Sequence, residues 1–133
     1  MFKNLDKLRN YSSVFLRVSI SFLFLWFGAS QLSDPSFWTS FVPSFVTDLS
    51  FVPSAQTLVI FNGIFEIIFG LLLLIGLFTR LSAGLLALHL FGIALSIGYN
   101  PLGIRDFVLA LATASVFLAG PDPWCLDMKW RSK

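Results

Sequence analysis

Charge is scarce in this sequence: only 12% of its 133 residues are charged, whereas soluble domains average about 25%. Hydrophobic residues make up 56% of the chain, Phe alone occurs 16 times, and the mean hydropathy is +0.83. This composition indicates a membrane protein. At about 20 residues per spanning helix, there is room for four spans with short connections, and we expect one domain over residues 1–133.

Metal ligands and thiols are also scarce. Cys125 is the only cysteine, which excludes an intramolecular disulfide, a CxxC redox pair and a Cys-based zinc site. His89 is the only histidine, and neither of the two Met lies inside an apolar run, so a bis-His or His/Met haem within one chain is excluded and a His-only haem is disfavoured. One His and one Glu are too few ligands for a structural zinc. No metal site is expected.

Four apolar runs predict an all-α membrane protein, an antiparallel bundle of four transmembrane helices over residues 14–32, 56–78, 81–99 and 104–119. Almost no linker separates the second run from the third, so these two helices must be antiparallel neighbours. The basic N-terminus before the first run also resembles a signal peptide. An arginine inside that run and the three spans that follow favour a retained helix.

The connection between the first two spans, residues 33–55, contains three Pro and neither Lys nor Arg. Asp34-Pro35 is typical of a helix N-cap followed by Pro at the first helical position. Phe37, Phe41 and Phe45 recur every four residues. We therefore expect a broken amphipathic helix that lies in the membrane interface.

The distribution of basic residues predicts the topology. Arg105 alone lies on one side of the predicted membrane, and the other side carries Lys3, Lys7, Arg9, Arg80, Lys129, Arg131 and Lys133. By the positive-inside rule, both termini of this multi-pass protein are cytoplasmic and the membrane is the cell (inner) membrane. The rule also accounts for the net charge of +2 and the pI near 9.0, so no nucleic-acid surface is expected.

Each span carries one stripe of small and polar residues at helical spacing. Packing seams explain the Gly, Ser and Thr in these stripes, but they do not explain Glu66 on the Asn62-Gly63-Glu66-Gly70 face. An unpaired charge at that depth costs at least a few kcal/mol. His89, on the next span, falls at a depth from which its side chain can reach Glu66.

The roles of three ionisable residues are left open by the sequence. Arg17 enters the membrane by only about 5 Å, and it either snorkels to the cytoplasmic surface or turns toward Glu66. Asp106 either caps the fourth helix or lines the outer mouth of a cavity. Glu66 is either a buried structural carboxylate, protonated or paired with Arg17 or His89, or a group that accepts protons and anchors a ligand. We favour the second reading of Glu66.

These residues predict a polar pocket inside the bundle. Glu66 and His89 are its candidate catalytic pair, and the candidate ligand-binding residues are Arg17, Asn62, Glu66, His89 and Asp106. A lipophilic ligand with polar oxygens would suit such a pocket, and a quinone fits that description.

Three segments resemble the DoxX/DoxD-like family of small four-helix membrane proteins: FLFLWFGASQLSD (22–34), EIIFGLLLLIGLFTRLSA (66–83) and GPDPWCLD (120–127). In that family a Lys often follows the Gly of the first motif, where this sequence has Gln31. The terminal motif usually reads Gly-x-Gly-x-x-Ser-Leu-Asp, and residues 120–127 depart from it. The resemblance implies a membrane subunit linked to thiosulfate:quinone oxidoreductase or to other redox and oxidative-stress systems.

We therefore expect an integral membrane subunit of a redox system that binds a quinone or a similar lipophilic ligand, with electrons supplied by a partner redox protein. Whether the chain is itself an enzyme stays open. The alternative is a non-catalytic membrane module for assembly or for handling a lipid or another small molecule.

Overall fold

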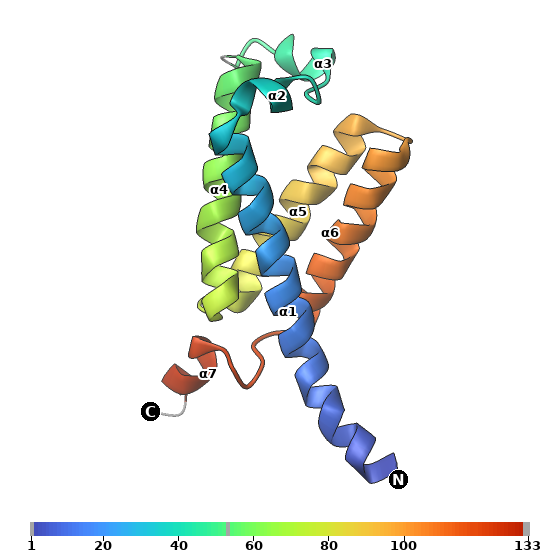
Figure 1. The fold of residues 1–133 in the computed structure, drawn as a ribbon, viewed down its shortest axis with the longest axis vertical. Helices are drawn as coiled ribbons and strands as arrows, with labels where there is room; N and C mark the ends of the chain where they lie inside the picture. The colour runs from blue at the N-terminus through green and yellow to red at the C-terminus, as the bar shows by residue number, and fades with distance from the viewer. Residues whose placement is uncertain (1, 53, 132–133) are drawn as a thin grey trace.

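The computed structural model describes residues 2–52 and 54–131, which form seven helices and no strand (Figure 1): α1 (Phe2–Ser33), α2 (Pro35–Thr39), α3 (Ser44–Thr47), α4 (Ala55–Ile75), α5 (Thr79–Ile97), α6 (Pro101–Ala119) and α7 (Leu126–Arg131). Among the basic residues used above to predict topology, Lys133 lies outside the described residues, as do the side chains of Lys3, Lys7 and Arg131.

Four of these helices, α1, α4, α5 and α6, are long and apolar enough to cross a membrane. The predicted four-helix membrane fold is confirmed, with shifts at the helix ends. α4 ends at Ile75 because Gly76 takes a left-handed conformation, with φ +71°. α6 begins three residues earlier than predicted because the Asn100 side chain accepts hydrogen bonds from the backbone N–H groups of Leu102 and Gly103.

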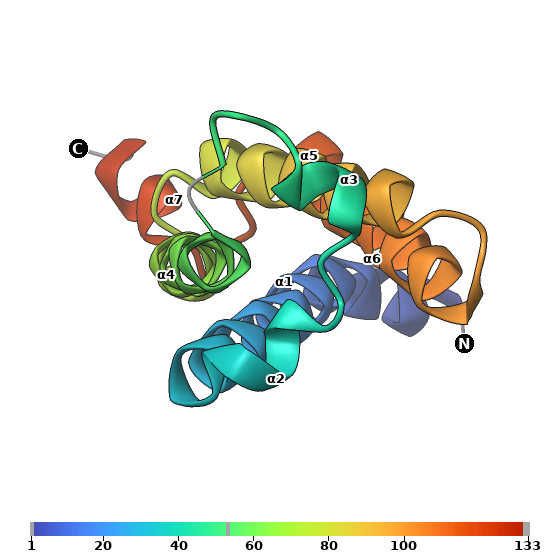
Figure 2. The ribbon, with the colours of Figure 1, turned by 90° about the horizontal axis from the view of Figure 1, so that it is seen from above.

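The long helices form two antiparallel pairs, α1 with α4 and α5 with α6 (Figure 1). The pairs lie close together where the C-terminal segment crosses the bundle, which we call the termini end. They diverge toward the opposite end, which carries α2, α3 and the α5–α6 turn and which we call the loop end (Figures 1 and 2).

Glycines let the first pair approach closely. A Cβ atom at Gly28 of α1 would lie 2.8 Å from the carbonyl oxygen of Gly63 in α4, and one at Gly63 would lie 3.0 Å from the oxygen of Gly28. The two backbones are therefore nearly in contact, as in other membrane helices that pack through small residues. This contact sets the distance between the polar side chains that α1 and α4 carry in the turns next to these glycines.

The hydrophobic core joins the two pairs. Its buried members come from all four long helices: Ile20, Phe24, Leu73, Ala83, Leu86, Leu90, Ala110 and Val116. Most of those on α4, α5 and α6 belong to the half of each helix nearer the termini end. The core therefore does not fill the space between the pairs at the loop end.

The segment α2–α3 covers the loop end (Figure 2). Asp34 caps α2 as predicted, because its Oδ1 accepts a hydrogen bond from the backbone N–H of Phe37 at 3.1 Å. The Trp38 indole N–H donates to Ser30 Oγ of α1 at 3.1 Å, which ties α2 to the end of α1. The predicted broken helix is confirmed, and its place in the membrane interface stays a prediction.

Candidate ligand-binding cavity

A cavity of about 490 Å³ lies between the two helix pairs at the loop end. Trp38, Phe41 and Val46 of the α2–α3 segment form its roof. Much of the remaining wall is apolar and aromatic. The polar residues in the wall come from all four long helices: Gln31, Asn62, Glu66, His89, Ser96, Arg105 and Asp106.

Glu66 is the most deeply buried of these polar residues. Its side chain is buried, with 3% of the residue exposed. Gln31 Nε2 donates to Glu66 Oε2 at 3.0 Å, and Asn62 Nδ2 approaches Oε1 at 3.4 Å. Asn62 Nδ2 also donates to Gln31 Oε1 at 2.8 Å, so the two amides orient each other. The carboxylate therefore faces two amide donors, one from α1 and one from its own helix.

His89 lies on the other side of the carboxylate. Its Nε2 is 3.7 Å from Glu66 Oε1, beyond hydrogen-bond distance. This nitrogen is buried and has no hydrogen-bond partner among the described residues. The imidazole contacts Phe65, with the ring centroids 4.6 Å apart and the ring planes tilted by 37°. The structure thus brings Asn62, Glu66 and His89 together, in agreement with the spacing argument from sequence.

Asp106 faces the same cavity from α6 and does not cap the helix, since Asn100 occupies that position. Its carboxylate is buried and accepts a hydrogen bond from Arg105 Nε at 2.9 Å. The Arg105 guanidinium is half-exposed and lies 5.4 Å from the centre of the Phe27 ring on α1. A cation–π contact of this kind links the two helix pairs across the mouth of the cavity.

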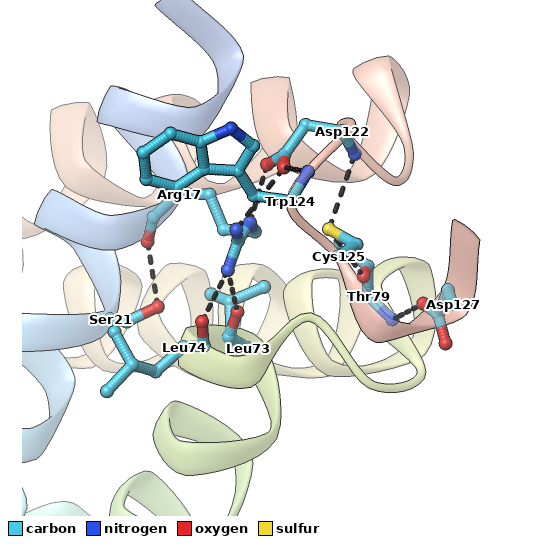
Figure 3. Close-up of polar contacts among 9 residues, drawn as sticks. All are labelled: Arg17, Ser21, Leu73, Leu74, Thr79, Asp122, Trp124, Cys125 and Asp127. Atoms are coloured by element: carbon cyan, nitrogen blue, oxygen red, sulfur yellow. Dashed lines mark hydrogen bonds and ion pairs between the residues drawn. The ribbon is translucent and has the colours of Figure 1, made fainter. Parts of the chain in front are cut away.

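Arg17 does not belong to this group, and neither of the two orientations considered from sequence is observed (Figure 3). Its Nε donates to Asp122 Oδ2 at 2.6 Å, and its Nη1 donates to the backbone oxygens of Leu73 and Leu74 at 2.8 and 2.5 Å. Arg17 is 2% exposed. The physical reason is that the carbonyl oxygens in the last turn of α4, which can accept a further hydrogen bond, and the Asp122 carboxylate are acceptors near its own depth.

The segment around Asp122 is held to the termini end by further contacts (Figure 3). Burial alone would raise the pKa of the Asp122 carboxyl, but the hydrogen bonds from Arg17 and the Trp124 N–H, with the Arg17 charge, lower it below its ordinary value. Asp127 accepts hydrogen bonds from the backbone N–H groups of Phe78 and Thr79 and so caps α5. These contacts close the bundle at the end opposite the cavity.

Three residues in these networks were not assigned these roles from sequence. Gln31 shares a helical face with Gly28, and this spacing is the signal that could have placed it opposite Glu66. Arg105 contributes to the sequence analysis only through its charge, in the prediction of topology. Asp122 lies 105 positions from Arg17, and no local pattern connects them.

The side chains of Glu66 and His89 are among the polar groups that a ligand in the cavity would contact. Glu66 offers a carboxylate oxygen to the cavity, and His89 offers an imidazole, whose nitrogens can donate or accept hydrogen bonds. The surrounding wall excludes much of the water that would otherwise solvate them. A ligand with a polar head and an apolar body can therefore place its head against Glu66 and His89 and pack its body against the apolar wall.

In the comparison with protein families, the model of the DoxX family matches residues 12–98, which include most of α1 and all of α2, α3, α4 and α5. No curated protein and no solved structure matches the chain.

Proposed function

This chain belongs to the DoxX family of membrane proteins, and we propose that it is a subunit of a redox system that binds a quinone or a similar lipophilic ligand in the cavity at its loop end. The observation that carries this proposal is that Glu66 lies 3.7 Å from a His89 nitrogen that has no hydrogen-bond partner among the described residues, inside a largely apolar cavity.

The size and lining of the cavity support a small lipophilic ligand. Its volume of about 490 Å³ falls within the range of about 300–1,000 Å³ that is usual for sites of small molecules. Phe27, Trp38 and Phe41 supply aromatic surface on which a flat ring can stack. The polar groups are few, which is typical of sites where they fix the orientation of an apolar ligand.

Glu66 and His89 carry the chemistry in this proposal. Reduction of a quinone to a quinol takes up two electrons and two protons, and its reversal releases them. The two side chains are the groups at the cavity wall that exchange protons with the ligand, and Asp106 assists from α6. A partner redox protein, of the thiosulfate:quinone oxidoreductase kind that the resemblance implies, supplies the electrons.

The proposal includes an orientation in the membrane. Arg9, Arg80 and Lys129 belong to the termini end, and Arg105 belongs to the loop end. The positive-inside rule then places both termini in the cytoplasm of a cell membrane protein. The cavity therefore opens toward the non-cytoplasmic half of the bilayer.

Binding can be measured through Trp38, which lies in the cavity roof. A protein with Trp26, Trp124 and Trp130 replaced by Phe keeps this single indole. In lipid nanodiscs, decylquinone should quench its emission saturably. For decylquinol, the reduced form, Glu66→Gln should raise the concentration that gives half-maximal quenching by about tenfold or more, because the quinol hydroxyl can donate to the carboxylate and hydrogen bonds to charged groups contribute about 1.5–3 kcal/mol.

Asp48→Asn is the matched control, since Asp48 is exposed on the loop side, outside the cavity wall, and the change is the same carboxylate-to-amide exchange. Its quenching should equal that of the parent. Quenching that rises linearly with quinone in the lipid, equally in all variants, would contradict the proposal.

A second measurement distinguishes a catalytic redox subunit from a module that only binds or delivers its ligand. In membranes that contain the partner system, Glu66→Gln should abolish quinone-dependent turnover. Saturable binding together with full turnover in that variant would instead assign the chain to the non-catalytic class, a membrane module that holds or delivers a lipophilic molecule.

A further inference from the structure

A polar pocket of about 240 Å³ lies at the termini end, remote from the cavity described above. Its wall is formed by Arg9, Asn10, Ser12 and Ser13 of α1 together with residues 119–123, the end of α6 and the segment after it. The candidate span of α1 begins at Leu8, and that of α6 ends at Ala119. This interfacial pocket therefore lies where two spanning helices leave the hydrocarbon core and meet the lipid headgroups.

Asp122 contributes a carboxylate to the wall, but Arg17 already balances its charge (Figure 3). Its Oδ2 accepts a hydrogen bond from Arg17 Nε at 2.6 Å. Its Oδ1 accepts from Arg17 Nη2 at 3.3 Å and from the Trp124 backbone N–H at 2.9 Å. Both oxygens are thus engaged, and the residue is 4% exposed. The pocket is therefore not an acidic site for a cation.

The α1 side of the interfacial pocket supplies hydrogen-bond donors. Arg9 and Asn10 are exposed, and Ser13 is half-buried. Among the described residues, none of these three side chains has a hydrogen-bond or ion-pair partner. Arg9, Ser13 and Arg17 follow one another at intervals of four, so they share one face of the helix. A guanidinium only donates hydrogen bonds, whereas an amide and a hydroxyl can also donate.

A second arginine lies beside the pocket. The Arg80 guanidinium of α5 packs against Gly120 of the wall so closely that a Cβ at Gly120 would lie 2.8 Å from both Nε and Nη2. Arg80 is exposed and forms no ion pair within the part of the chain that the structure describes. The described charges at this site are thus three arginines against one aspartate, which favours an anion.

We propose that the interfacial pocket binds the phosphate group of an anionic phospholipid. Phosphate oxygens carry negative charge and only accept hydrogen bonds, so they complement the donors of Arg9, Asn10 and Ser13. Arg80 adds to the attraction from the far side of the backbone at Gly120. Basic pockets between membrane helices at the headgroup level are typical sites for anionic lipids.

The position of the pocket favours a lipid over a soluble phosphate ester. Phe15 lies two residues further into the membrane than Ser13, and Leu118 directly precedes Ala119 at the end of the α6 span. These two side chains are 77% and 72% exposed. They offer apolar surface at the depth where the acyl chains of a headgroup-bound lipid begin.

The test is native mass spectrometry of the purified protein in a neutral detergent, titrated with phosphatidylglycerol or phosphatidylcholine of the same acyl chains. Both lipids carry a phosphate, but the choline places a positive charge near the arginines. The parent should bind phosphatidylglycerol about fivefold or more tightly than phosphatidylcholine. Arg9→Gln and Arg80→Gln should each weaken phosphatidylglycerol binding by about fivefold, since a basic residue near the headgroups contributes about that factor.

Lys129→Gln is the matched control, because it removes the same charge from the same end of the bundle but outside the pocket wall. It should keep the parent's preference between the two lipids. An equal affinity of the parent for both lipids overturns the proposal. A loss in Lys129→Gln as large as that in Arg9→Gln also overturns it, because the preference then reflects the overall charge of this end.

The soluble headgroup identifies the source of the phosphate. Glycerol 3-phosphate at millimolar concentration should leave the bound phosphatidylglycerol in place. Its displacement at that concentration overturns the lipid as the ligand and assigns the interfacial pocket to a soluble phosphate ester. Arg9 and Arg80 are exposed, so their substitution leaves the packed core intact, and the comparison of lipids on the parent needs no variant.

Discussion

Arg17 and Asp122, 105 positions apart in the chain, form a buried ion pair with 2.6 Å between Nε and Oδ2. Both side chains are at most 3% exposed. The pair ties the segment after α6 to the first long helix, while Arg17 also contacts the last carbonyls of α4. One guanidinium therefore joins three parts of the chain at the termini end, away from the cavity.

Removing the acid from this pair should destabilise the fold strongly. Asp122→Asn leaves the Arg17 charge buried without its counter-charge, a change that typically costs about 3–5 kcal/mol. Thermal unfolding in detergent, followed by circular dichroism, should show a clear fall in the midpoint. Asp48→Asn, at an exposed site, should leave the midpoint unchanged. A midpoint for Asp122→Asn equal to that of the parent would refute a stabilising ion pair.

The same pair predicts a pH dependence. The pKa of Asp122 is lower in the folded protein than its ordinary value of 3.8, so the folded state binds fewer protons there than the unfolded state in this range. The stabilisation is therefore complete above about pH 5 and is lost as the pH falls through the lowered pKa. The difference in unfolding midpoint between the parent and Asp122→Asn should be constant from pH 7 to about 5 and should shrink below about pH 4. A difference that grows on acidification would contradict this sign.

The contact between α1 and α4 should not tolerate a side chain. A Cβ at Gly28 meets the Gly63 oxygen at 2.8 Å and Ile67 Cγ1 at the same distance, so Gly28→Ala pushes the helices apart. We expect a loss of about 1–3 kcal/mol and weaker decylquinone binding, because Gln31 moves away from Glu66. Gly92→Ala is the control for stability, since its Cβ meets nothing within 4 Å. Equal unfolding midpoints for the two variants would show that the close approach is not maintained.

Access to the cavity should come from the loop end. Cys125 is fully buried and burial raises the pKa of its thiol, so the native chain should react negligibly with maleimides before denaturation. Ser96→Cys then introduces a thiol in the cavity wall, and Ser12→Cys introduces one near the termini end. In sealed vesicles of known orientation, a membrane-impermeant maleimide should label them from opposite faces, Ser12→Cys from the cytoplasmic face. Labelling of both from one face would reject the proposed access route.

Local patterns in the sequence determined much of the fold. The four apolar runs identified the spans because the bilayer requires about 20 apolar residues per helix. Asp34-Pro35 located the start of α2, since a cap and its helix are neighbours in the chain. Helical periodicity placed Asn62 and Glu66 on one face, and depth alone put His89 within reach of Glu66.

Only the tertiary structure decided which partner each polar side chain takes. Arg17 could reach several acceptors from its depth, and the path of residues 120–127 under the bundle selected Asp122. Gln31 reaches Glu66 because Gly28 and Gly63 bring two backbones into contact. Periodicity is a property of a single helix, whereas such pairings depend on how helices pack and diverge. The sequence therefore determined that a buried carboxylate exists in this protein, and the packing of the four helices decided that it faces a cavity.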